Sequence, residues 1–165
     1  MKLSAIRMEQ SGAPLYLTYM TADQLLAHSY IDEWRPELGW DIERQGFQRE
    51  PVPRHYEAIG HFLKESSNPF IPTAALLSAA EDRLGKLPFK VLDKNAGFGV
   101  LTISEARQLL ILDYQHRWRG LRFAIEELDA DRLGTFVMPV VIVPNIPRFE
   151  EIRQFYLNQQ QAAED

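Results

Sequence analysis

The 165-residue sequence contains no cysteine. That absence excludes disulfides, zinc–thiolate sites and thiol catalysis, and it makes a reducing cytoplasm the natural setting. Long hydrophobic runs are lacking as well, because the longest one, residues 136–144, reaches only about half the length of a membrane-spanning helix. Charged residues also interrupt residues 1–9, where a signal peptide needs an unbroken apolar core. We therefore expect a cytoplasmic protein that does not cross a membrane.

Several catalytic and metal-binding patterns are missing too. The chain has neither the G-x-x-x-x-G-K-[ST] phosphate loop nor the G-x-S-x-G nucleophile elbow. His55 and His61 are six residues apart, whereas two ligands on one face of a helix need a spacing of three or four. The acidic pairs at 32–33 and 126–127 consist of adjacent residues that point to different faces, so they do not form a catalytic carboxylate pair. We predict no metal site.

The basic residues of the chain are strongly biased toward arginine. The net charge of −5 and the pI of about 5.4 argue against a protein that coats nucleic acid by charge alone, so any contact with nucleic acid must be local. Thirteen of the eighteen basic residues are arginine, whose planar fork suits phosphate and carboxylate oxygens. Seven of them form two groups: Arg44, Arg49 and Arg54, and then Arg107, Arg117, Arg119 and Arg122.

The order of the predicted elements indicates a mixed α/β fold in a single domain spanning residues 1–165. A β-hairpin surrounds the turn signal at 11–14, and Thr21 caps the helix that follows. The predicted strands are 2–10, 14–20, 70–80, 89–92, 99–103, 108–113 and 137–143. The predicted helices are 22–28, 54–64, 115–128 and 148–160.

Aromatic residues anchor the less regular part of the chain. Residues 30–53 are predicted to form an ordered loop held by Trp34, Trp40 and Phe47, since two tryptophans are seldom found in a free linker. The chain ends while its composition still favours a helix, so we expect either a short variant of a longer protein or the N-terminal part of one. The helix at 54–64 has one predicted buried face, formed by Tyr56, Ile59, Phe62 and Leu63.

The main candidate site is the turn between the strand at 108–113 and the helix at 115–128. The apolar run 109–112 is typical of a strand covered on both faces, and it delivers Asp113 to the carboxyl end of that strand, where ligands gather in α/β folds. The start of the helix adds unpaired N–H groups and a partial positive charge. Asp113 can cap the helix or orient an arginine. The side chains that complete a phosphate-sized receptor are Gln115, His116, Arg117 and Arg119.

Taken alone, these residues are more often a polar helix start with surface salt bridges than a ligand site, and the group at 44–54 is more often a solvated loop than a binding patch. A family resemblance makes a ligand site the favoured interpretation of residues 113–119. The segment 112–121, Leu-Asp-Tyr-Gln-His-Arg-Trp-Arg-Gly-Leu, resembles the signature of DGQHR-domain proteins, the group that includes the DNA phosphorothioation-associated protein DndB. That group is regarded as related to the ParB/sulfiredoxin-like fold, which implies a mixed sheet flanked by helices.

The ParB motif Gly-Glu-Arg-Arg-x-Arg-Ala lies over residues 114–120, with Arg117 and Arg119 matching. In ParB-type proteins this stretch handles nucleotide phosphates, so the resemblance implies the same role for Gln115, His116 and both arginines. Tyr114 stands where the family has glycine, a residue that would permit a positive φ or a close approach of the backbone to a ligand. The tyrosine either stacks on a base or blocks the pocket.

Two further stretches resemble the family. Residues 44–54 precede a helix as a Gln-Arg-containing segment does in DndB-like proteins, and residues 153–160 resemble the family's helix that ends in a pattern of phenylalanine and asparagine. The secondary ligand candidates are therefore Arg44, Gln48, Arg49, Arg54 and Asn158.

The resemblance implies a module that binds nucleotide or DNA-backbone phosphate in a bacterial or phage DNA-modification or regulatory system. DNA or a nucleotide is the expected partner, an NTP is the one cofactor considered, and a homo-oligomer or protein partners are left open. The first alternative is an NTP-hydrolysing or phosphotransfer enzyme, in which Gln115 and His116 position a water or phosphoryl group and the arginines neutralise it. The second is a degenerate structural or partner-binding relative, which Tyr114 and the short length of the chain make plausible.

Overall fold

Eight strands form one mixed β-sheet, in the order β3-β7-β4-β8-β2-β1-β6-β5. The computed structural model describes residues 1–33, 35–39, 46, 48, 50–79, 87–103, 109–144 and 146–164. The strands are β1 Lys2–Gln10, β2 Ala13–Thr21, β3 Ser29–Tyr30, β4 Ala75–Ala79, β5 Phe89–Asp93, β6 Phe98–Thr102, β7 Leu109–Asp113 and β8 Val137–Pro144. The helices are α1 Ala22–His28, α2 Pro53–Glu65, α4 Gln115–Glu126 and α5 Arg148–Glu164, with short 3₁₀ helices η1 at Pro36–Leu38 and η2 at Asp131–Thr135. The mixed α/β fold predicted from the sequence is confirmed.

The amino-terminal hairpin forms as predicted. β1 and β2 pair in antiparallel fashion, and the two residues between them, Ser11 and Gly12, have φ angles of 50° and 80°, as two-residue hairpin turns require. The side chain of Thr21 then accepts a hydrogen bond from the Gln24 N–H at 3.2 Å, and the Gln24 side chain accepts one from the Thr21 N–H at 3.0 Å. This capping box starts α1 at the predicted residue.

Strand β7, which carries the candidate site at its end, is buried on both faces. It pairs with β3 in parallel and with β4 in antiparallel fashion, and its first four residues are all buried. Leu109 and Ile111 belong to the main core. Since neighbouring residues of a strand point to opposite faces, Leu110 and Leu112 are buried on the other side of the sheet. The continuous apolar run therefore has the environment that the sequence predicts.

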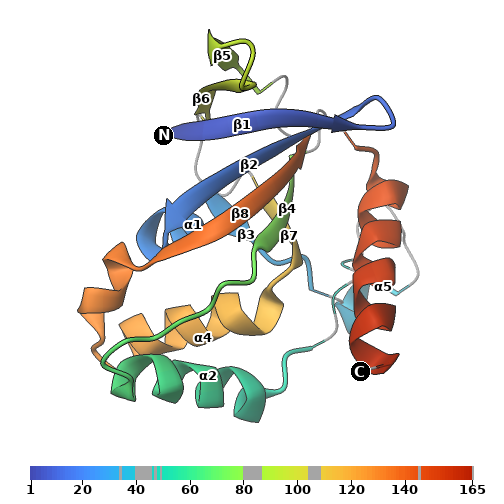
Figure 1. Ribbon diagram of the computed structural model, residues 1–165. Helices are drawn as coiled ribbons and strands as arrows, with labels where there is room; N and C mark the ends of the chain where they lie inside the picture. The colour runs from blue at the N-terminus through green and yellow to red at the C-terminus, as the bar shows by residue number, and fades with distance from the viewer. Residues whose placement is uncertain are drawn as a thin grey trace.

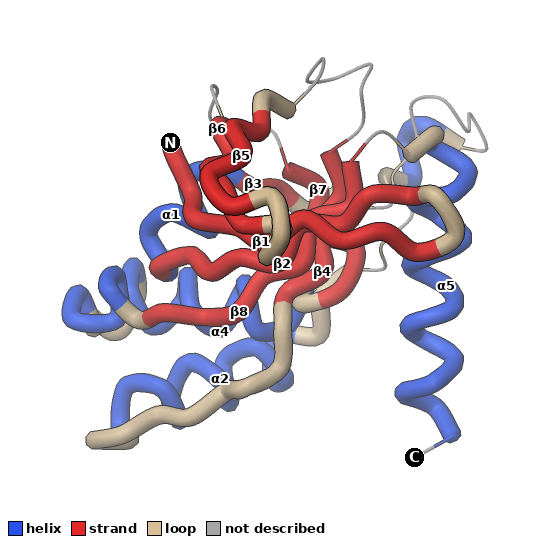
Figure 2. The backbone as a smooth tube through the Cα atoms, turned by 45° about the horizontal axis from the view of Figure 1, so that its top comes forward, coloured by secondary structure: helices blue, strands red, loops and turns tan. Residues whose placement is uncertain are grey.

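Helices cover this part of the sheet from both sides (Figures 1 and 2). On one side, α1, α2 and α4 contribute Leu25, Leu63 and Leu121 to the main core. On the other side α5 contacts β7, and the Ser78 hydroxyl of β4 donates a hydrogen bond to the buried carboxylate of Glu151 on α5. β7 is thus enclosed between α1, α2 and α4 on one side and α5 on the other.

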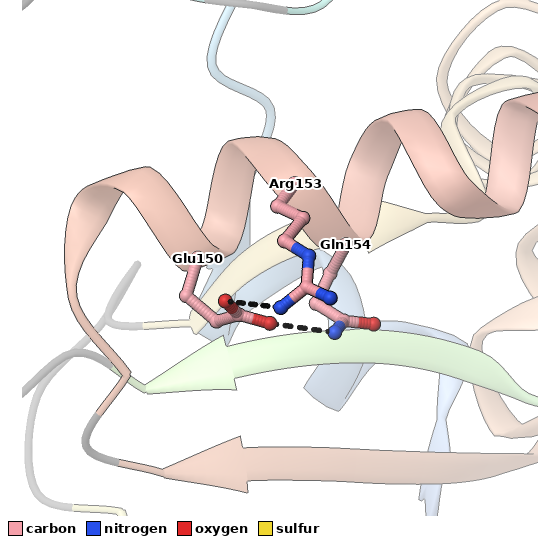
Figure 3. A network of polar contacts seen from close by, with 3 residues as sticks. All are labelled: Glu150, Arg153 and Gln154. Carbon is pink, nitrogen blue, oxygen red and sulfur yellow. Dashed lines mark hydrogen bonds and ion pairs between the residues drawn. The ribbon is translucent and has the colours of Figure 1, made fainter.

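The start of α5 is set by a proline, as predicted. The Glu150 N–H donates to the carbonyl of Pro147 at 2.9 Å, so the first helical turn forms directly after the proline. Within the first turns, the Glu150 carboxylate accepts hydrogen bonds from Gln154 at 2.8 Å and Arg153 at 3.3 Å (Figure 3). These bonds, that of Gln154 first, lower the pKa of Glu150 and support the helix at spacings of three and four residues.

Helices α2 and α4 run side by side in the same direction (Figure 1), and two glycines let them approach closely. A Cβ atom on Gly120 would lie 2.6 Å from Cγ2 of Ile59, and one on Gly60 would lie 2.6 Å from Cδ1 of Phe123. Real side chains essentially never approach so closely, so glycine is the residue that fits at this contact. The close approach also brings the amino ends of the two helices together.

Two predictions of local structure are wrong. The strand predicted at 70–80 begins only at Ala75, and Phe70 is 79% exposed, because Pro72 cannot donate a ladder hydrogen bond and keeps the preceding segment out of the sheet. Phe62 was expected in the buried face of α2 but is 51% exposed, because the side of α2 that meets α4 runs through Ile59 and Gly60.

Other parts of the fold lie beyond the sequence predictions. The two-residue strand β3 and the 3₁₀ helix η2 were not predicted. The three expected loop anchors, Trp34, Trp40 and Phe47, lie outside the described residues.

Gly120→Ala should destabilise the protein by a net of about 0.5–2 kcal/mol, because overpacking a tight contact usually costs about 1–3 kcal/mol. The added methyl group would meet the Ile59 side chain, and this cost exceeds the gain of about 0.5–1 kcal/mol that alanine has over glycine within a helix. Urea denaturation measures the loss. Arg122→Ala, on an exposed position of the same helix, is the control and should change the free energy of unfolding by less than about 0.5 kcal/mol. Equal stability of Gly120→Ala and wild type would contradict the close contact.

Candidate functional site

The amino ends of α2 and α4 form one electropositive region. The rings of His55 and His116 meet edge to face there, with their centroids 5.6 Å apart. Neither helix has an acidic residue in its first turn. The dipole of each helix leaves a partial positive charge at its amino end. The free N–H groups come mainly from α4, because α2 begins at Pro53, which has no N–H, and its His55 N–H donates to the Val52 carbonyl at 2.9 Å. Two such ends side by side favour an anion.

Tyr114 is the residue from which α4 starts, and its backbone is unusual. Its φ of 129° and ψ of 9° lie in a region that side-chain-bearing residues rarely adopt. This is the position where the resemblance places glycine, so the tyrosine keeps a glycine-like backbone. Its side chain is 1% exposed, and among the described residues none gives its hydroxyl a partner with hydrogen-bond geometry. Tyr114 is therefore a strained, buried support for the helix start.

Arg117 packs against the ring of Tyr114. Its guanidinium lies 4.3 Å from the centre of the Tyr114 ring, a favourable cation–π distance. Its Nη1 donates a hydrogen bond to the hydroxyl of Thr73, in the segment that leads into β4. These two contacts fix the guanidinium beside the start of α4, and the side chain stays half-buried.

The surroundings of His116 disfavour its protonation. Burial lowers the pKa of His116, and the neighbouring His55 and Arg117 lower it further. Burial also raises the pKa of the Tyr114 hydroxyl, an effect that the charge of Arg117 opposes. His116 is thus held near Arg117 as a neutral ring, and an anion at this place would ease its protonation.

Arg119 points away from this region. Residues two apart on a helix lie roughly 200° apart around its axis, and Arg119 makes an ion pair with Glu33 on the side of α4 opposite to Arg117. Its side chain is 17% exposed, and burial, with the charge of Arg122, lowers its pKa. The structure therefore divides the predicted receptor between two sides of α4.

The remaining predicted residues stay near the helix start. Asp113 is half-buried at the end of β7, and Gln115 is half-buried in the first turn of α4. The N-cap position of α4 is occupied by Tyr114, whose side chain makes no capping hydrogen bond, so Asp113 lies one residue before the cap. The group that the structure brings together is therefore His116 and Arg117 of the predicted set, with His55 and Thr73 in addition.

Comparison with known proteins identifies the family. The family model described as "DndB: DNA-sulfur modification-associated" matches residues 3–164, almost the whole chain. The chain belongs to the DndB family. This membership implies involvement in DNA sulfur modification, as the resemblance suggested, whereas the DGQHR and ParB/sulfiredoxin-like relationships stay predictions. No curated protein and no solved structure matches the chain.

The secondary ligand candidates of this DndB-family chain lie in different environments. Gln48 is completely buried, and its Nε2 donates a hydrogen bond to the carbonyl of Ile111 in β7. Arg54 is exposed in the first turn of α2, on the same helix end as His55. Arg44, Arg49 and the side chain of Asn158 lie outside the described residues.

In the part of the chain that the structure describes, no three His, Asp or Glu residues gather as metal ligands, and no helix is long and apolar enough to cross a membrane.

Sequence reasoning missed the contributions of His55, Thr73 and Glu33. His55 was weighed only as a metal ligand together with His61, and its exposed place in the first turn of a helix was the available signal. Thr73 and Glu33 lie in irregular segments, where no periodicity shows which side chain approaches α4. Only the fold brings these residues to the two sides of that helix.

Tyr114→Phe should leave the DndB-family chain as stable as wild type or stabilise it by up to about 1 kcal/mol. The change removes a buried hydroxyl without a partner among the described residues, whose desolvation costs free energy, and keeps the aromatic ring under Arg117. Urea denaturation provides the comparison. A loss of more than about 1 kcal/mol would mean that the hydroxyl is hydrogen-bonded after all.

The stability of the protein should fall as the pH drops through the ordinary histidine pKa of 6.5, because the pKa of His116 lies lower in the folded state. The unfolded chain then binds more protons than the folded one, so this contribution is complete above pH 6.5 and is lost toward the folded-state pKa. In His116→Gln the difference in urea midpoint between about pH 7.5 and 5.5 should shrink. His61→Gln, at an exposed ring, is the control. An unchanged pH dependence in His116→Gln would contradict the assignment.

Proposed function

We propose that the paired amino ends of α2 and α4 bind a phosphate group of the DNA backbone or of a nucleotide, as the part of this chain in DNA sulfur modification. The observation that supports this best is the grouping of His55, His116 and Arg117 around two helix starts without an acidic residue in their first turns. Unpaired helix N–H groups together with basic side chains are a recurrent phosphate-binding arrangement.

The contacts of Arg117 suit it for this role. A guanidinium has several N–H donors in one plane, and the contact with Thr73 uses one of them. The Tyr114 ring supports the guanidinium from one face, so its orientation is limited before a ligand arrives. A phosphate can then accept a charge-assisted hydrogen bond from the arginine and further bonds from the helix N–H groups.

The charge of the protein limits what kind of DNA contact this can be. With a net charge of −5, the protein as a whole repels DNA, so a contact with DNA has to be local. Two or three phosphate contacts would give a slope of log binding constant against log salt of about −2 to −3. Contacts to phosphate position a protein on DNA without reading its sequence, so the proposed binding is independent of base sequence.

Arg117→Ala should weaken the binding of fluorescently labelled duplex DNA about tenfold or more, since hydrogen bonds to charged groups are worth roughly 1.5–3 kcal/mol. Fluorescence anisotropy between about 50 and 200 mM salt measures the affinity and its salt slope, and labelled ATP tests the nucleotide source in the same way. Arg7→Ala removes the same charge from an exposed position on β1 and is the matched control.

Equal losses in Arg7→Ala and Arg117→Ala would indicate diffuse attraction and contradict the site. Failure of wild type to bind either DNA or ATP would refute the proposal as a whole. Phosphate release from bound ATP that disappears in His116→Ala is the result that the enzymatic alternative requires.

A further inference from the structure

A second place for a ligand lies on the opposite side of α4. A pocket of about 350 Å³ opens between α4 and the segment 26–33. Arg119, Arg122 and Glu126 line it from the helix, and Glu33 lines it from the facing segment. None of the residues of the proposed phosphate site lines this pocket, which we call the Arg119 pocket.

The charges of the Arg119 pocket balance. Arg119 makes an ion pair with Glu33, and Arg122 makes one with Glu126 at 2.9 Å. A phosphate entering the pocket would meet two carboxylates as well as two guanidinium groups, so it gains little there. The pocket therefore favours a neutral polar ligand, in contrast to the electropositive region at the helix starts.

One wall of the Arg119 pocket carries both a hydrogen-bond donor and a hydrogen-bond acceptor. The Nε atom of Arg119 is buried and has no hydrogen-bond partner among the described residues. The side chain of Glu33 is 40% exposed, so its carboxylate can accept further hydrogen bonds. A buried donor without a partner is costly, and a ligand atom that accepts from it would satisfy it. The wall thus fits a ligand edge on which an acceptor lies beside a donor.

The rest of the pocket offers apolar and aromatic surface. Trp118 is largely buried at 7% exposure, and its indole N–H already donates to the Ser29 hydroxyl at 3.0 Å. The guanidinium of Arg122 lies 5.7 Å from the centre of this ring. Leu26 and Ile31 also line the pocket. A ligand in the pocket would therefore contact the Trp118 ring, the planar guanidinium of Arg122 and aliphatic side chains. Such a lining suits a flat molecule.

We propose that the Arg119 pocket binds a nucleobase. Each nucleobase is flat and carries an acceptor beside an N–H donor on its hydrogen-bonding edge, and pairing of carboxylate with base amine and of guanidinium with base acceptor is a recurrent mode of recognition. A volume of about 350 Å³ lies at the small end of ligand pockets, which suits a base with its sugar. This inference goes beyond the phosphate proposal and does not depend on it.

Titration calorimetry with the four 2′-deoxynucleosides, which carry no phosphate, tests the proposal on the intact chain. At least one nucleoside should bind with saturation, and its affinity should fall about tenfold or more in Arg119→Gln and in Glu33→Gln, the loss expected for a base contact. Arg7→Gln should bind as wild type does. Binding that depends on both Arg119 and Glu33 supports the pocket as the site.

Two results would overturn the proposal: no binding of any nucleoside to folded wild-type protein, or unchanged affinity in both variants. Thermal melting by circular dichroism checks that the variants are folded. If Arg119→Gln unfolds, Glu33→Gln still decides the question, because it keeps the shape of a partly exposed side chain. Since nucleosides lack phosphate, failure here leaves the DNA-binding measurement unaffected, and the two proposals fail separately.

Discussion

The close packing of α2 against α4 is the constraint on which the candidate site depends. Two helices that run in the same direction bring like partial charges together at their amino ends. The repulsion is smaller than the roughly 0.3–1 kcal/mol that a full charge contributes at one helix end, because each end carries only about half a charge. Burial of one leucine contributes roughly 1.5–3 kcal/mol, and each helix places a fully buried leucine, Leu63 and Leu121, in the main core. Packing therefore outweighs the repulsion, and the two ends remain together without acidic partners in their first turns.

Much of the fold was predictable because its signals are local. The hairpin turn, the capping box of α1 and the apolar run of β7 each depend on residues close together in the sequence. The start of β4 and the exposure of Phe62 depend instead on what lies opposite each element in space. Strand β3 is only two residues long, too short to show any alternation, and it exists because β7 offers it an edge.

The candidate site was predictable in its location and not in its composition. The strand-to-helix turn after β7 was identified from burial pattern and residue type, and the resemblance found there names the family whose model matches residues 3–164. Helical geometry already separates Arg117 from Arg119, yet a linear motif presents them as neighbours. Their partners Thr73 and Glu33 come from distant, irregular segments, so the sequence carried no pattern that identified them.

The backbone of Tyr114 has a consequence for how a ligand would be bound. A φ of 129° costs a side-chain-bearing residue of order 1–3 kcal/mol, and this cost is met during folding by burial of the ring and its contact with Arg117. The direction of the first N–H groups of α4 is thereby set before any encounter. Binding to such a preorganised backbone would lose little conformational entropy, which in the proposed site favours even a small anion with few contacts.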